Sequence, residues 1–297
     1  RVLVTGATGF VGGRLVPALR ETGHECTVLT RDADRYEGPN DVRIVEGDLL
    51  EPGSFETAFE DCAAAYYLVH SMESENFEAR DRRAARNFSC AASDSGVERV
   101  VYLGGLGRES DALSAHLRSR REVERVLKAG AYDLTVLRAA IIVGAGGASF
   151  EMIRQFVEHL PRICVLPLPT AVYTKCQPIA IKDVIAYLVC VLAVPETSGK
   201  TFDIGGSAVL THADLLQRTA RARGRWLFVV SVPWVGERTA AYWLTRLTDV
   251  PESIVSPLMR GLDNTVVVRN GDIEEFVSVK HTTIDSAIER AIADEDS

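Results

Sequence analysis

Short apolar segments alternate with amphipathic segments along the first half of the chain. Runs rich in β-branched residues, typical of buried strands, cover residues 1–6, 25–31, 42–48, 63–71, 97–105 and 133–144. Between them, a 3.6-residue apolar repeat predicts helices over 10–23, 54–62, 76–96 and 112–130. Alternating strands and helices predict an α/β fold with a doubly wound parallel sheet, whose strand ends meet at one ligand-binding edge.

The regular alternation of predicted strands and helices ends after Gly144. Helices are predicted over 149–161 and 211–224, a strand followed by a helix over 177–194, and strands over 200–206 and 225–233. Two more helices, separated by Pro251, are predicted farther along the chain. We therefore expect a nucleotide-binding domain of residues 1–143 and a smaller C-terminal α/β substrate lobe of residues 144–297. Segments near 176–205 are expected to return to the main sheet.

Composition excludes several functional classes. The chain has 297 residues, 46% of them hydrophobic, and a net charge of −8 with its basic residues scattered, which argues against a nucleic-acid-binding surface. Six cysteines without CxxC or metal-like spacing predict free thiols, no metal site and a cytoplasmic protein. No uncharged run reaches the roughly 18 residues of a transmembrane segment. The chain opens on a strand without an initiator Met, so we expect a few upstream residues to precede it.

The glycine pattern at the first strand–helix turn is the strongest chemical signal. Gly6, Gly9 and Gly12 follow the strand and open the helix. Gly6 allows the tight turn, Gly9 lets the backbone approach a diphosphate, and Gly12 permits close packing of the helix on the strand. Free amides at the helix start then hold the phosphates, which assigns Thr8, Phe10 and Val11 to the same site.

With the spacing TGxxGxxG the sequence resembles the extended or atypical short-chain dehydrogenase/reductases, whose fold is a Rossmann-type sheet. The segments "LVHSM", "HLRSR" and "IIVGAGGASFE" resemble the NmrA-like, NAD(P)H-binding branch, which includes epimerase-like proteins and relatives of the complex I 39-kDa subunit. The resemblance implies that the adenine lies near Asp48 and Leu49. It also implies that Leu68, Val69 and His70 run along the ribose–nicotinamide half.

The second strand bears on the choice of nicotinamide. An NAD-binding site of this kind ends that strand in a carboxylate that accepts from the ribose 2′-hydroxyl. Here the strand ends in Arg31, and a guanidinium pairs with a 2′-phosphate. We therefore expect NADP(H) to be preferred. NAD(H) is the alternative, because Asp32 follows directly and could reach the ribose in a shifted register.

The helix predicted over 112–130 carries two polar residues, His116 and Arg120, near the middle of its apolar face, while Arg118, Arg121 and Glu122 fall on the other face. The resemblance places these two where active members of the superfamily have the catalytic tyrosine and lysine. Gly104 and Gly105 stand where such members have a serine. His116 is then the candidate acid/base and Arg120 the candidate ribose contact.

Arg120 should lower the pKa of His116, because a nearby cation disfavours imidazolium. The alternative is that carboxylates of the neighbouring helix, such as those of Glu78 or Asp81, satisfy both side chains. Arg138, on a strand, is interpreted as one half of a buried ion pair.

Two functions remain open at this point. One is an NAD(P)-dependent oxidoreductase or epimerase-like enzyme acting on a small apolar or isoprenoid-like substrate. The other is a non-catalytic NADP(H)-binding redox sensor, or an accessory protein of a respiratory, NADH dehydrogenase-like complex. The cluster of Trp226, Trp234 and Trp243 indicates a lobe core or a homodimer contact, or peripheral association with a membrane complex.

Overall fold

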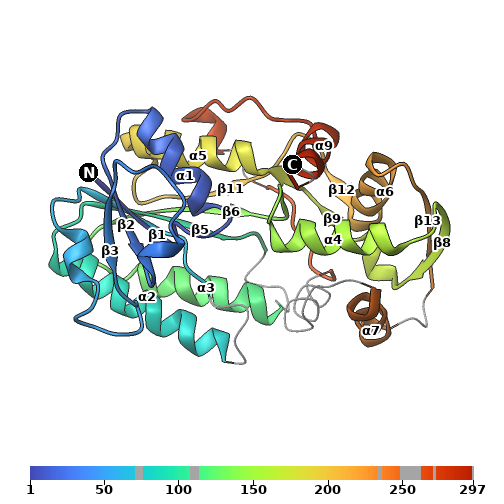
Figure 1. Cartoon of the computed structure of the whole chain (residues 1–297), viewed down its shortest axis with the longest axis horizontal. Coiled ribbons are helices and arrows are strands. Elements are labelled where there is room, and N and C mark those ends of the chain that lie inside the picture. The colour runs from blue at the N-terminus through green and yellow to red at the C-terminus, as the bar shows by residue number, and fades with distance from the viewer. Residues whose placement is uncertain (71–75, 108–113, 233–235, 248–261, 270–271, 296–297) are drawn as a thin grey trace.

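Seven parallel strands form the central sheet in the computed structural model, which describes residues 1–70, 76–107, 114–232, 236–247, 262–269 and 272–295 (Figure 1). The strand order is β11-β6-β5-β4-β1-β2-β3. Strands β1 to β3 are added toward one edge of the sheet and β4 to β6 toward the other, so the switch in strand order lies between β1 and β4. The strands are β1 (Val2–Thr5), β2 (Cys26–Thr30), β3 (Arg43–Glu46), β4 (Ala64–Tyr67), β5 (Arg99–Gly105), β6 (Asp133–Ala139) and β11 (Thr201–Ile204). The predicted doubly wound fold is confirmed.

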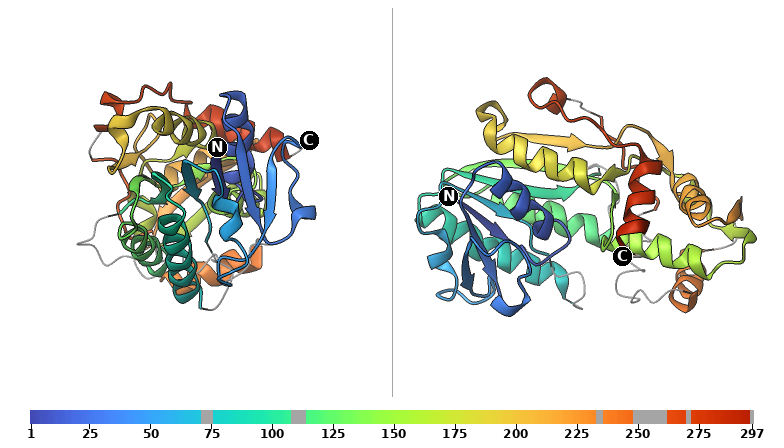
Figure 2. Two further views of the ribbon diagram at one scale, coloured as in Figure 1. Left: turned by 90° about the vertical axis from the view of Figure 1, so that its left-hand side faces the viewer. Right: turned by 45° about the horizontal axis from the view of Figure 1, so that its top comes forward.

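Helices cover both faces of this sheet, as the two views of Figure 2 show. α1 (Gly12–Glu21) and α5 (Ile181–Ala193) pack on one face, and α2 (Phe77–Asp94) and α3 (Ala115–Leu127) on the other. α1 ends where Gly23 adopts φ +87°, a conformation that a side chain would strain. The strands are buried on both faces, which explains their continuous apolar runs.

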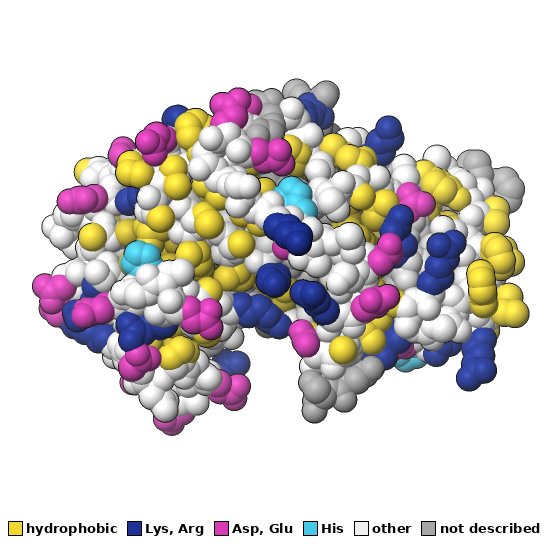
Figure 3. All heavy atoms as spheres, turned by 90° about the horizontal axis from the view of Figure 1, so that it is seen from above, with side chains coloured by type: hydrophobic (Ala, Val, Ile, Leu, Met, Phe, Trp, Pro, Cys, Tyr) yellow, Lys and Arg dark blue, Asp and Glu magenta, His cyan; other side chains and the backbone are white. Residues whose placement is uncertain are grey.

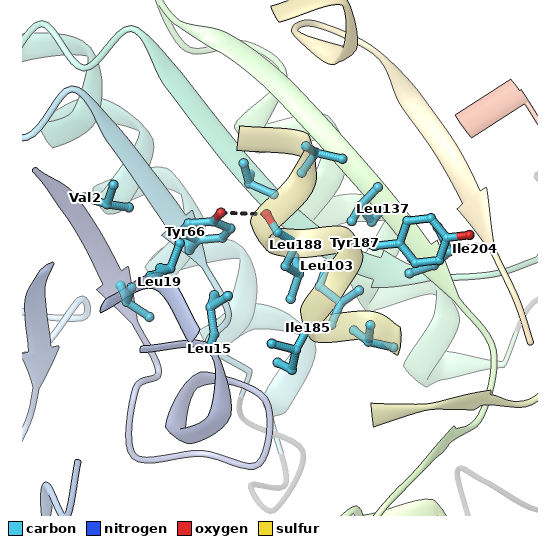
Figure 4. Packing of buried hydrophobic residues seen from close by; sticks show 14 of the residues in the cluster. Val2, Leu15, Leu19, Tyr66, Leu103, Leu137, Ile185, Tyr187, Leu188 and Ile204 are labelled. Atoms are coloured by element: carbon cyan, nitrogen blue, oxygen red, sulfur yellow. Dashed lines mark hydrogen bonds between the residues drawn. The ribbon is translucent and has the colours of Figure 1, made fainter. Parts of the chain in front are cut away.

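Tyr66 and Tyr67 point to opposite faces of β4, and both are fully buried. The Tyr66 hydroxyl donates to the Leu188 carbonyl of α5 at 2.7 Å (Figure 4). The Tyr67 ring packs against Phe88 of α2 and Tyr102 of β5, and its hydroxyl is buried without a hydrogen-bond partner among the described residues. Of these two neighbouring hydroxyls, that of Tyr66 is hydrogen-bonded and that of Tyr67 is not, within the described part of the chain.

The elements after β6 lie mostly at the far end of the molecule (Figure 1). We call them the lobe: α4 (Ala148–His159), β8 (Ile163–Leu168), η3 (Thr170–Tyr173), α6 (His212–Ala222), β13 (Trp226–Ser231), α7 (Glu237–Leu247) and α9 (Ile284–Glu295). Two-stranded pairings connect it to the sheet: β7 (Ile142–Val143) with β10 (Ile179–Ala180), and β9 (Lys175–Cys176) with β12 (Leu210–Thr211). η1 (Ala33–Arg35), η2 (Glu56–Phe59), η4 (Pro195–Thr197) and η5 (Asp272–Glu275) are short 3-10 turns.

Three local predictions were wrong. The helix expected over 54–62 is only the 3-10 turn η2, because Glu56 accepts the amides of Gly53 and Phe55 and so closes a tight turn. The strand expected over 133–144 breaks after Ala139, since β7 leaves the sheet to pair with β10. Arg121, placed on the outer face of its helix, is buried and donates to the Gly107 carbonyl and to Glu124.

The tryptophan cluster is not a lobe core at the one position that the structure describes, because Trp226 is 61% exposed on β13. Trp234 and the side chain of Trp243 lie outside the described residues, as do Leu113 and the segment that contains Pro251. Among the described helices, none combines the length and apolar character needed to cross a bilayer.

We predict opposite effects of removing the two neighbouring hydroxyls on β4. Tyr66→Phe should lower the free energy of unfolding by about 1–2 kcal/mol, because the Leu188 carbonyl loses its buried donor. Tyr67→Phe should leave it unchanged or raise it, because its hydroxyl has no partner in the described part of the chain. Denaturant titration of both variants measures the difference, and equal losses would contradict this account of the two faces.

Candidate functional site

The turn between β1 and α1, at the edge of the sheet, is shaped by glycines in close contact with backbone. Gly6 adopts φ +71°, and a Cβ there would lie 2.8 Å from the Leu68 carbonyl oxygen at the end of β4. A Cβ on Gly12 would collide with the carbonyl of Gly6. Gly9 is different, because its Cβ would meet only the Gly6 oxygen, at 3.2 Å. Gly6 and Gly12 therefore fix the turn, and Gly9 keeps its outer side clear.

The start of α1 fits a dinucleotide diphosphate. Its N-cap residue, Val11, offers no side-chain hydrogen bond, and its first turn contains no acidic residue. The amides of such a helix end favour an anion through their hydrogen bonds and the helix dipole. A capping carboxylate would compete for the same amides, and none is present in this turn. Thr8 is exposed beside the turn.

Phe10 connects this turn to the start of the lobe. Its ring is the nearest side chain to Gly147, where a Cβ would lie 2.9 Å from Cζ. Arg14 stacks over the Phe10 ring at 4.9 Å and donates to the carbonyl of Ala145 at 2.9 Å. The glycines of the "VGAGG" segment thus serve to admit an aromatic ring. This role was not predicted from the sequence, because it joins residues more than 130 positions apart.

At the adenine end, Arg31 is exposed just after β2 and takes part in none of the ion pairs found in the described residues. Asp32 caps the start of η1, where its Oδ1 accepts the amide of Asp34. Asp48 likewise accepts the amide of Leu50. Leu49 is buried in the core beneath them, so an adenine here would meet its backbone rather than its side chain.

The ends of β4 and β5 bring the remaining predicted residues together. Leu68 and Val69 are half-buried next to the glycine turn, and His70 is exposed at its rim. On α3, which begins where Ser114 caps the amide of Leu117, His116 and Arg120 are half-buried. Contact of these residues with a nicotinamide stays a prediction.

Arg120 crosses the end of β5, where its Nη1 donates to the Leu103 carbonyl at 3.2 Å. The alternative in which Glu78 or Asp81 of α2 satisfies His116 and Arg120 was wrong. Glu78 pairs with Arg118 at 2.9 Å, and Asp81 accepts from Ser119 at 3.0 Å. Arg138 does form the expected ion pair, with Glu124 at 2.5 Å.

Gly105 has a steric reason to lack a side chain. A Cβ there would lie 2.8 Å from Cδ2 of Leu117 and 3.7 Å from Cγ of Arg120. α3 therefore packs so closely on the end of β5 that a serine would displace Leu117.

The Arg120 charge lowers the pKa of both nearby imidazoles. At the half-buried His116, burial is the larger cause and the Arg120 charge the second, and together they lower the pKa to about 3. At His70, which is exposed at the rim, the Arg120 charge is the largest cause of the lowered pKa. At pH 7 each ring can donate or accept a hydrogen bond, but neither holds an extra proton to give away.

A cavity of about 170 Å³ opens beside this cluster and runs into the lobe. Gly105, Leu106 and His116 line its sheet end, and the lobe contributes apolar side chains together with one imidazole: Met152, Ile153, Phe156, Leu168, Val172, His212 and Leu216. None of its lining residues in the described part of the chain is Lys, Arg, Asp or Glu. The described residues also contain no cluster of three or more metal-ligating side chains.

Residues 6–154, which contain the glycine turn and the His116–Arg120 helix, match a family model described as NAD(P)H-binding. The chain belongs to this NAD(P)H-binding family. It is 27% identical over 276 residues to a mitochondrial NADH dehydrogenase [ubiquinone] 1 alpha subcomplex subunit 9 of Arabidopsis thaliana, covering 88% of this chain and 67% of that protein. It is 27% identical over 199 residues to the ceramide reductase of Caulobacter vibrioides, covering 65% of this chain and 61% of that protein.

Proteins of known structure share the fold over nearly the whole chain. The Citrobacter sp. triphenylmethane reductase, solved with NADP(H), has a TM-score of 0.78 and 18% identity and covers 98% of this chain and 99% of its own. A nucleoside-diphosphate-sugar epimerase of Staphylococcus aureus has a TM-score of 0.76 and 16% identity, with 97% and 99% coverage. These neighbours support the fold alone, while several sequence relatives extend beyond this chain, which spans 61% of the Dictyostelium discoideum subunit 9.

Arg120→Gln should raise the pKa of both imidazoles, measured from the ring proton resonances of the folded protein. His70 should respond more strongly, because the Arg120 charge is its largest cause, and His116 should stay below 6.5 because burial remains. Arg118→Gln, on the exposed face of the same helix, is the matched control and should move neither. A wild-type His116 that titrates near 6.5 would contradict the geometry.

Proposed function

We propose that this protein is an NADP(H)-dependent reductase of a small, uncharged, apolar carbonyl compound. The observation that carries the proposal is the uncharged cavity that reaches His116 and Gly105 at the edge of a nucleotide-binding sheet. A bound reduced nicotinamide supplies a hydride. The residues of this chain then have to hold the cofactor, orient the carbonyl and exclude water.

Each residue has a role that suits its charge. The amides of the Gly6–Gly12 turn hold the diphosphate, and Arg120, which is positive at any working pH, can donate to the ribose. His116 is neutral, so it acts by donating a hydrogen bond to the carbonyl oxygen rather than by giving up a proton. The oxyanion takes its proton from solvent water as the product leaves the cavity, which releases hydroxide.

Arg31 supports the preference for NADP(H). It is exposed at the end of β2, while Oδ1 of the nearby Asp32 accepts the amide of Asp34 at the start of η1. A guanidinium in this position gives a 2′-phosphate charge-assisted hydrogen bonds. Neighbours of the same fold were solved with NADP(H) or with NAD, so the proposed preference rests on Arg31.

A second candidate function is that of a non-catalytic, cofactor-stabilised subunit of a larger complex, as the subunit 9 relatives suggest. The observation that favours it is an apolar face on the lobe, where Ile163, Val165, Trp226 and Phe228 of β8 and β13 are each more than half exposed. Figure 3 shows hydrophobic side chains gathered at this end of the molecule. Such patches mark interaction sites, in a homodimer or in an assembly at a membrane. Two relatives are mitochondrial, so the cytoplasmic location stays a prediction.

Turnover separates the two functions. We expect the protein to oxidise NADPH in the presence of uncharged aromatic or short aliphatic aldehydes and ketones, and to ignore carboxylated analogues. His116→Leu should lower kcat roughly a hundredfold, because it removes the donor to the developing oxyanion. NADPH affinity should change little in this variant. Tight NADPH binding without turnover of any carbonyl would overturn the reductase and leave the accessory role.

Arg31→Asp should weaken NADPH binding about ten- to a hundredfold, because a repulsion replaces charge-assisted bonds, and should leave NADH binding nearly unchanged. Calorimetric titration with both dinucleotides measures the ratio of affinities. Arg290→Asp makes the same charge change on an exposed position of α9 and serves as the control. An unaltered ratio of NADPH to NADH affinity in Arg31→Asp would mean that Arg31 is a surface residue without cofactor contact.

A further inference from the structure

The cavity has a second imidazole at its lobe end. His212 begins α6 and lines the same cavity as His116, which stands on the opposite side of the sheet edge on α3. The side chains between them are mostly aliphatic or aromatic, from Ile141, Met152, Ile153, Phe156 and Leu216. The cavity is therefore apolar along its length, with one neutral ring near the reacting centre and another away from it.

His212 has a polar atom that the protein itself leaves unpaired. The residue is 9% exposed, and its Nε2 is buried with no hydrogen-bond partner among the described residues. Buried polar side chains are nearly always paired, so an orphan at a cavity wall is a candidate for ligand contact. Burial lowers the pKa of His212 to about 4, and the ring is therefore neutral at pH 7.

The start of α6 does not need this ring. Thr211 and Asp214 form a reciprocal capping box, in which Thr211 accepts the amide of Asp214 at 3.1 Å and Asp214 accepts the amide of Thr211 at 2.8 Å. The box fixes the backbone on which His212 stands. The box thus pairs the amides of Thr211 and Asp214 without help from the imidazole.

We propose that His212 recognises an uncharged hydroxyl or carbonyl oxygen at the end of the substrate remote from the reacting carbonyl. This inference rests on the proposed reductase function and narrows its substrate class to apolar molecules with oxygen at both ends. A neutral imidazole can donate to an oxygen or accept from a hydroxyl, but it offers no charge to a carboxylate or phosphate. Ser114 is already occupied as the cap of α3, which leaves Ser149 as the other polar side chain in the described lining.

Two ligands of matched shape test the proposal: para-hydroxyacetophenone and para-methylacetophenone, titrated calorimetrically into the protein saturated with NADP⁺. The wild type should bind the hydroxyl compound about three- to tenfold more tightly, as expected for one neutral hydrogen bond. His212→Leu should abolish or reverse this preference, and His212→Gln should keep part of it. His159→Leu, an exposed histidine at the end of α4, is the matched control and should keep all of it.

The folding of His212→Leu is checked by thermal unfolding, and its midpoint should not fall below that of the wild type, because the substitution removes an unpaired buried polar atom. Equal binding of the two ketones by the wild type, binding of neither, or a preference that survives in His212→Leu would overturn the assignment of His212. NADPH consumption is followed separately. A His212-dependent preference without turnover would remove the reductase function only, whereas turnover without a preference would remove only the role of His212.

Discussion

Contact of glycine with backbone and side chains at three points is the constraint on which the site depends. Gly6 lies against the end of β4, Gly12 lies against Gly6, and Gly105 lies under Leu117 of α3. A methyl group at Gly6 or Gly12 would collide with backbone, whereas at Gly105 it would meet the flexible end of the Leu117 side chain. These contacts place the free amides of α1, the end of β4 and the inner face of α3 around one crevice. The glycines are therefore geometric parts of the site, and only Gly9 leaves room for a ligand.

The tight packing at Gly105 also determines the electrostatics. Because α3 lies so close to β5, Arg120 can reach the Leu103 carbonyl and extend its charge over both His116 and His70. A tyrosine and a lysine in these places would form a proton-transfer pair whose lysine lowers the pKa of the tyrosine. Arginine in place of lysine keeps the positive charge. Beside a histidine that charge lowers the pKa of the imidazole, so the ring carries no extra proton at pH 7. In the proposed reductase, these residues therefore bind and polarise the substrate rather than transfer a proton.

The main sheet was predictable because its signals are local. Each strand is a short apolar run, each crossover helix has its own periodicity, and the glycine turn occupies seven consecutive positions. The failures share a different cause. Arg121 was misplaced because a helical wheel gives only the direction of a side chain around the helix axis. It cannot show that the Gly107 carbonyl lies in that direction and accepts a hydrogen bond from Arg121. The ring of Phe10 against Gly147, and the cavity that joins His116 to His212, are built from segments distant in sequence, and no single stretch carries their signature.

The chemistry of the lobe bears on function more directly than the sheet does, since one fold hosts many activities. A sheet of this kind occurs both in a triphenylmethane reductase solved with NADP(H) and in a nucleoside-diphosphate-sugar epimerase, so it cannot distinguish between their substrates. A sugar nucleotide brings a second diphosphate, and a buried diphosphate needs cations or amides to offset its charge. The described lining of this cavity supplies neither lysine nor arginine. The phosphate-rich cofactor thus belongs to the sheet edge, and the neighbouring cavity suits an uncharged substrate. His116 lines the end of the cavity where the two would meet.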